Sequence, residues 1–107
     1  MLPRKEQAGF CLVTAKSKHQ LGTVLQNPRS ELRNYLRHLS QVELAELRMM
    51  LIKGRHRSRY EAHSWRIETL RGINDPAEKT VDFIVNEQQK GQYLWCAMTA
   101  VQQASAW

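Results

Sequence analysis

Residues 53–66, KGRHRSRYEAHSWR, bring cationic, imidazole and aromatic side chains together in one short stretch. Guanidinium and ammonium groups bind phosphate, and a flat aromatic ring stacks on a nucleobase or supports an arginine. These residue types predict a surface that contacts DNA or RNA. Its members are expected to be Lys53, Arg55, Arg57, Arg59, Tyr60, Trp65, Arg66 and Arg71.

Two other interpretations of the stretch stay open. Arg57 precedes Glu61 by four residues, and Glu68 follows, so the stretch also fits a solvated helix face whose arginines pair with carboxylates. A basic face equally suits a protein-protein interaction module, an inhibitor or adaptor, that binds an acidic partner. The leading hypothesis is a small, non-enzymatic, regulatory protein that binds nucleic acid through residues 53–71.

Arg57 and His63 raise a third hypothesis, which is enzymatic. A fixed cation can hold a phosphate and an imidazole can transfer a proton, as cleavage of a phosphodiester requires. Their spacing resembles that of small all-helical ribonucleases of the HEPN class, in which the arginine and histidine of paired chains meet the scissile phosphate. The resemblance implies a dimeric ribonuclease as a lesser alternative. Against it, the residue after the arginine is Ser58, and a histidine on an apolar helix face is more often a packed residue.

No metal or cofactor is expected. His56, Glu61 and His63 lack a further ligand at a suitable distance, and the sequence has no glycine-rich phosphate loop and no nucleophile elbow. Cys11 and Cys96 lie far apart, in no spacing typical of metal or redox sites, and are expected to be free thiols.

The distribution of charge favours a polyanionic partner more than the net charge does. The 107 residues include 16 Lys and Arg against 10 Asp and Glu, a formal charge of +6. More than half of the cationic residues lie between 29 and 71, whereas 73–107 holds only Lys79 and Lys90. Affinity for phosphate grows with the number of contacts made. With neither a signal-peptide core nor a membrane-length apolar run, the chain is predicted to be soluble and cytoplasmic.

Capping signals divide the chain into helices that must position this stretch. Ser40-Gln41-Val42-Glu43 is a capping box, which predicts that one helix ends near Leu39 and another begins at once. Asn27-Pro28 and Asp75-Pro76 each offer a capping side chain followed by proline at a first helical position. Apolar spacing then predicts helices at about 29–39, 41–53, 57–71, 76–89 and 92–105.

The helix at 41–53 is apolar around most of its girth and is predicted to be the central one. Gly54 and Gly72 are expected to end the second and third helices, Gly54 in the left-handed conformation, and Lys90-Gly91 to end the fourth. In the last helix one apolar stripe is expected to hold Leu94, Ala97, Met98, Val101 and Ala104.

Part of this region looks like a DNA-binding motif. Residues 39–47 resemble locally the first helix of repressor helix-turn-helix motifs, but the helix continues through 49–52 and Gly54 comes too late for the usual turn. A non-standard DNA-binding motif of two helices, with 57–71 as its recognition helix, stays possible.

The sequence thus predicts an all-α single domain, a compact bundle of four to five short helices. Residues 1–28 are expected to form an extended N-terminal arm or irregular segment, and 29–107 the helical core. Trp95 is expected in the core or at a dimer interface, and Trp107 under cover of its own domain or a partner. Small residues along the last helix suggest a homodimer through that helix.

Overall fold

The computed structural model describes residues 24–105, which form five helices and contain no strand. The all-α class predicted from the sequence is therefore confirmed. In chain order the helices are α3 (Arg29–Leu36), α4 (Gln41–Arg55), α5 (Ala62–Ile73), α6 (Ala77–Asn86) and α7 (Lys90–Ser105). Most of the predicted N-terminal arm, together with Cys11 and Trp107, lies outside the described residues.

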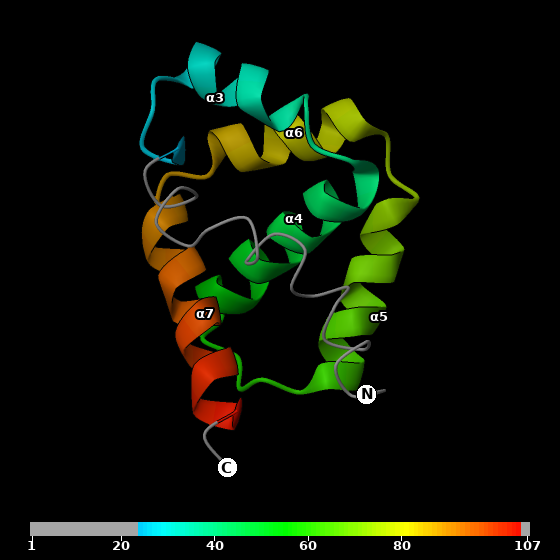
Figure 1. Cartoon of the computed structure of the whole chain (residues 1–107), viewed down its shortest axis with the longest axis vertical. Coiled ribbons are helices and arrows are strands. Elements are labelled where there is room, and N and C mark those ends of the chain that lie inside the picture. The colour runs from blue at the N-terminus through cyan, green and yellow to red at the C-terminus, as the bar shows by residue number, and fades with distance from the viewer. Residues whose placement is uncertain (1–23, 106–107) are drawn as a thin grey trace.

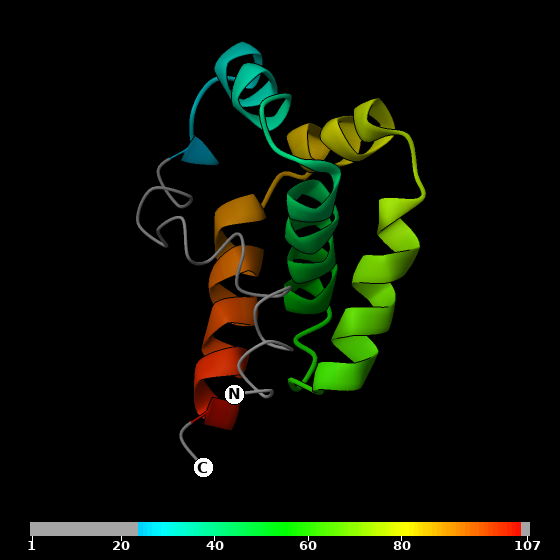
Figure 2. The same ribbon diagram turned by 45° about the vertical axis from the view of Figure 1, so that its right-hand side comes forward.

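The central position predicted for the second helix is confirmed. Helix α4 lies between α5 and α7 and contacts both, while α3 and α6 pack together across one end of this layer (Figures 1 and 2). At the opposite end, residues 56–61 join α4 to α5 and lie beside the C-terminal half of α7. We refer to residues 56–61 as the α4–α5 loop.

Burial of α4 on most of its sides builds the core. From 43 to 51 every residue other than Arg48 is buried, and the carboxylate-bearing Glu46 is fully buried with the rest. Helix α6 contributes Val81, Ile84 and Val85, whose spacing along the sequence places them on one face of the helix. Each fully buried aliphatic side chain contributes roughly 1.5–3 kcal/mol to stability, so α4 is the element on which the other helices depend.

The start of α4 follows the sequence prediction, whereas the starts of α3 and α6 do not. Ser40 Oγ accepts a hydrogen bond from the N–H of Glu43 at 3.1 Å, and Glu43 Oε1 accepts one from the N–H of Ser40 at 2.9 Å. In the other two helices the prolines are not at the first helical position, because the extended backbone of Pro28 and of Pro76 places them at the N-cap. Neither helix has a side-chain cap; the carboxylate of Asp75 lies 3.4 Å from the guanidinium of Arg48 instead.

Gly54 and Gly72 do not end their helices, which corrects the prediction made for both. Neither has a positive φ, and each lies inside a helix at a close helix–helix contact. A Cβ on Gly54 would lie 1.8 Å from the carbonyl oxygen of Tyr93 in α7. A Cβ on Gly72 would lie 3.4 Å from the Cβ of Ala45 and 3.0 Å from the guanidinium of Arg48. The two glycines therefore set how closely α7 and α5 approach α4.

Helix α4 ends at Arg55 and α5 begins only at Ala62, so the predicted helix at 57–71 is wrong at its start. The carboxylate of Glu61 accepts a hydrogen bond from the N–H of Ser64 at 2.6 Å and caps α5 from outside. Because the α4–α5 loop separates the helices, Arg57, Arg59 and Tyr60 belong to irregular backbone rather than to a recognition helix.

The connection between α6 and α7 comes earlier in the chain than predicted, at 87–89 rather than at 90–91. Helix α6 ends at Asn86, and Lys90 begins α7 rather than ending the preceding helix. Its Nζ donates to the carbonyl oxygens of Glu87 at 2.8 Å and Val85 at 3.4 Å. The partial burial that these contacts require lowers the pKa of the Lys90 amine. The side chain thus holds the end of α6 against the start of α7.

Candidate functional site

Acidic residues between 75 and 87 neutralise one group of arginines. The pairs are Arg33–Asp82, Arg37–Glu78 at 2.9 Å, Arg48–Asp75 at 3.4 Å and Arg55–Glu87 at 4.0 Å. The hydrogen bonds from Arg37 lower the pKa of the Glu78 carboxyl. Pairs this exposed contribute little to stability. Their effect is on the surface field, since they cancel positive charge where α6 meets α3 and near the end of α4.

A second group of arginines has no such partner. Arg57, Arg59, Arg66 and Arg71 are exposed, and no carboxylate of the described residues lies within ion-pair distance of them. Arg57 and Glu61, which the sequence offered as an ion pair, do not form one, because the carboxylate of Glu61 caps α5. Lys53 is half-buried, and its Nζ lies 3.4 Å from Ser64 Oγ. Of the arginines among residues 24–105 that lack such a partner, all but Arg29 therefore lie in the α4–α5 loop or on α5.

Arg57 occupies a backbone conformation that favours glycine. Its φ is 52°, the one positive φ of a non-glycine residue among residues 24–105. The N–H of Arg57 donates to the carbonyl of Gly54 at 3.1 Å and that of Ser58 to Lys53 at 2.9 Å, the bonds of a Schellman motif. A side chain at this position costs about 1 kcal/mol. Residues held in such conformations cluster at functional sites, so Arg57 is a candidate for a functional role.

Replacing Arg57 with Gly is expected to raise the free energy of unfolding by about 0.5–1 kcal/mol, since glycine adopts this φ without strain. Arg59→Gly is the matched control, because Arg59 is a loop arginine without a positive φ. There glycine only increases the freedom of the unfolded chain and lowers stability. Urea denaturation of both variants measures the difference, and shifts of the same sign would contradict the assignment of strain to Arg57.

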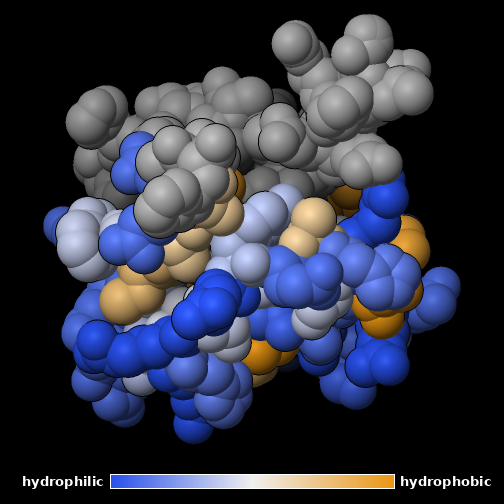
Figure 3. Space-filling model, turned by 90° about the horizontal axis from the view of Figure 1, so that it is seen from below, coloured by the Kyte–Doolittle hydropathy of each residue, from blue (hydrophilic) through white to orange (hydrophobic). Residues whose placement is uncertain are grey.

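A pocket of about 820 Å³ opens between the α4–α5 loop and α7. We call it the loop–α7 pocket. The loop side is formed by 57–60, and the α7 side by Trp95, Cys96, Thr99, Ala100, Gln103 and Ala104. Figure 3 looks onto this end of the molecule, where hydrophilic residues cover much of the described surface and hydrophobic residues show between them. Two of the unneutralised arginines, Arg57 and Arg59, line this pocket.

Trp95 does not lie in the core, which was one of the two positions expected for it. It is 67% exposed, because Leu94 and Ala97 occupy the side of α7 that faces inward. Successive residues of an α-helix are 100° apart, which places most pocket residues of α7 on the side opposite Leu94. Their position on the polar side of the helix is the signal by which the sequence could have identified them. Ala104, assigned to the stripe, is exposed and lines the pocket. Whether α7 also forms a dimer stays a prediction.

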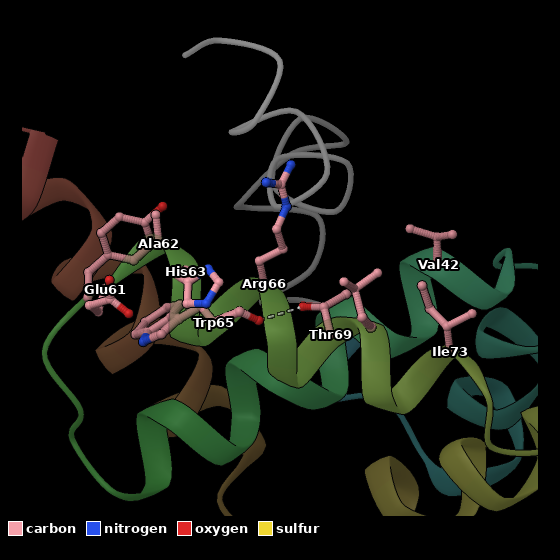
Figure 4. Close-up of a pocket in the computed structure, with 10 residues that line it drawn as sticks. Val42, Glu61, Ala62, His63, Trp65, Arg66, Thr69 and Ile73 are labelled. Atoms are coloured by element: carbon pink, nitrogen blue, oxygen red, sulfur yellow. Dashed lines mark hydrogen bonds between the residues drawn. The ribbon is translucent and has the colours of Figure 1, made fainter. Parts of the chain in front are cut away.

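A second pocket, of about 590 Å³, runs along α5, and Figure 4 shows residues that line it. Arg66 extends away from the helix here, and Tyr60 lines both pockets, so the two adjoin. Trp65 is only 2% exposed. Its ring meets the Tyr60 ring edge-on with centroids 5.0 Å apart, and its carbonyl accepts a hydrogen bond from Thr69 Oγ1 at 3.0 Å. The structure thus places Trp65 in the core rather than at the surface.

The basic set predicted from the sequence is therefore divided. Arg57 and Arg59 lie at the loop–α7 pocket and Arg66 at the α5 pocket, whereas Arg71, in the last turn of α5, lines neither. His63 lines the α5 pocket and Arg57 the other, so the two residues of the ribonuclease hypothesis do not share a pocket within one chain.

Among residues 24–105, no three His, Cys, Asp or Glu side chains gather as metal ligands, and Cys96 is a free thiol. None of the helices in this range is long and apolar enough to cross a membrane. No protein-family model matches the sequence, and no curated protein or solved structure shows significant similarity to it. Function is therefore argued from the geometry of the site alone.

Proposed function

We propose that this protein is a small, non-enzymatic, regulatory protein of the cytoplasm that binds nucleic acid through the α4–α5 loop and the adjoining face of α5. Arg57, Arg59 and Arg66 contact phosphates, and Arg71, about 140° around α5 from Arg66, lies at the margin of the surface. The observation that carries the proposal is the division of the arginines. Arg33 and Arg37 pair with carboxylates, whereas these four have no carboxylate partner among the described residues.

The division matters because an arginine already paired with a carboxylate must lose that partner before it binds a phosphate, whereas an unneutralised one releases counterions on binding. Arg55, 57% exposed and 4.0 Å from Glu87, is intermediate and lies at the margin of the surface. Lys53 is half-buried and also lies at the margin. The strain at Arg57 supports the same conclusion, since glycine is the residue that folding alone favours there.

The test is a salt series with labelled DNA and RNA, measured by fluorescence anisotropy. For Arg57→Ala/Arg59→Ala, the slope of log K against log salt is expected to become shallower by about 1.4–1.8, since each lost phosphate contact accounts for roughly 0.7–0.9. The matched control is Arg29→Ala/Lys79→Ala, which removes the same formal charge from exposed positions on α3 and α6 at the other end of the molecule. The control is expected to keep the wild-type slope.

Equal loss of slope in both double variants would show that net charge rather than the α4–α5 loop attracts nucleic acid. Failure of the wild-type protein to bind either DNA or RNA at low salt would overturn the proposal. An acidic protein partner would then be the better hypothesis, to be sought by co-purification.

A further inference from the structure

The loop–α7 pocket has features that a phosphate-binding surface alone does not need. Trp95 exposes two-thirds of its side chain at the wall of this pocket, beside Arg57 and Arg59 of the α4–α5 loop. An exposed indole offers a flat apolar face, and a planar group that stacks on this face removes it from water. Its position at the edge of a pocket with two cationic residues indicates a ligand that is both planar and anionic.

The remaining wall combines apolar and polar side chains and carries no negative charge. Ser58, Thr99 and Gln103 supply hydroxyl and amide groups that donate and accept hydrogen bonds, and no Asp or Glu lines the pocket. Its volume of about 820 Å³ falls within the range of roughly 300–1,000 Å³ typical of sites that bind small molecules or cofactors. A nucleobase with its phosphate fits this description in size, in hydrogen bonding and in charge.

We propose that the loop–α7 pocket binds an unpaired nucleotide of a single-stranded nucleic acid, whose base stacks on Trp95 while Arg57 and Arg59 hold the adjacent phosphates. This inference rests on the proposed function and narrows its ligand to single strands. Inside a duplex both faces of each base are covered by neighbouring bases, so Trp95 can stack only on a terminal base pair. The loop arginines also lie on irregular backbone, not on a helix that enters a major groove.

The two pockets adjoin at Tyr60, which defines a path for the strand across the surface. A single strand seated in the loop–α7 pocket passes over the loop and reaches Arg66 in the α5 pocket. Arg66 then contacts a phosphate further along the strand, in line with binding sites that track several nucleotides through alternating stacking and ionic contacts.

The experiment compares labelled single-stranded RNA, single-stranded DNA and blunt duplex DNA by anisotropy at fixed salt. Wild-type protein is expected to bind the single strands at least about tenfold more tightly than the duplex. Trp95→Ala is expected to weaken single-strand binding about tenfold, the loss of one stacked base. It leaves duplex binding and the salt slope unchanged, because stacking is not ionic. Trp95→Phe, which keeps an aromatic face, is expected to recover most of the affinity.

His38→Ala is the control, since His38 is an exposed aromatic side chain just after α3 that lines neither pocket. It is expected to bind as the wild type does. Unchanged single-strand affinity in Trp95→Ala, or equal affinity for single strands and duplex, would overturn the pocket assignment. The response of Arg57→Ala/Arg59→Ala to salt would still support the proposed function. Absence of binding to every oligonucleotide would overturn both.

Discussion

Replacing Gly54 with Ala is expected to lower the free energy of unfolding by about 3 kcal/mol, a large part of the roughly 5–15 kcal/mol available to a domain of this size. The added methyl would lie 1.8 Å from the carbonyl oxygen of Tyr93, well inside van der Waals contact. That oxygen belongs to the backbone of α7 and cannot rotate away, so the two helices must separate. Separation loosens the core that both build, including Leu51 and Leu94.

Thermal unfolding followed by circular dichroism measures this effect, as a midpoint lowered by roughly 10–20 °C. Gly91→Ala is the matched control: it makes the same change inside helix α7, where a Cβ would meet nothing within 4 Å. Because Gly91 is the second residue of α7, the better helix propensity of alanine is expected to raise stability there by at most about 0.5 kcal/mol. A Gly54→Ala protein as stable as wild type would mean that α4 and α7 do not meet at this point.

Replacing Trp65 with Ala is expected to cost about 3–5 kcal/mol, because it removes the largest fully buried side chain of the described core and leaves a cavity. The change also removes the edge-on contact with Tyr60, a residue that lines both pockets. Loss of nucleic-acid binding in this variant would therefore report unfolding rather than a lost stacking contact. Equilibrium denaturation in urea provides the measurement.

Trp95→Ala is the control for that experiment, since it removes the same side chain from an exposed position. Its stability is expected to stay within about 0.5 kcal/mol of wild type. The two tryptophans thus separate the contributions of folding and binding: one variant unfolds, and the other stays folded but loses single-strand affinity. Similar stabilities for both variants would contradict the burial assigned to Trp65.

The ionic arrangement of the surface could not be obtained from the sequence. Arg33 and Asp82 lie 49 positions apart, and Arg37 and Glu78 lie 41 apart, yet each pair meets where α3 packs on α6. Charge clustering along the chain pointed to residues 29–71 as one basic region. The packing of the helices neutralises several of its arginines and leaves the others, so the candidate site is smaller than the region predicted for it.

What the sequence by itself determined is local. The capping box at Ser40 and the apolar girth of the helix after it depend on residues within a turn or two of each other, so the start and central position of α4 could be derived. Spacing along one helix likewise identified Val81, Ile84 and Val85 as an inner face.

Tertiary structure decided the rest, because those features depend on where a second element lies. From the sequence alone Gly54 is expected to end a helix. In the fold it is the position where α4 contacts the backbone of Tyr93. Trp65 and Trp95 have the same side chain, and only the packing of α5 and α7 on α4 buries the first and exposes the second. Local rules specify which segments become helices, whereas the exposure and charge of each side chain follow from how those helices pack.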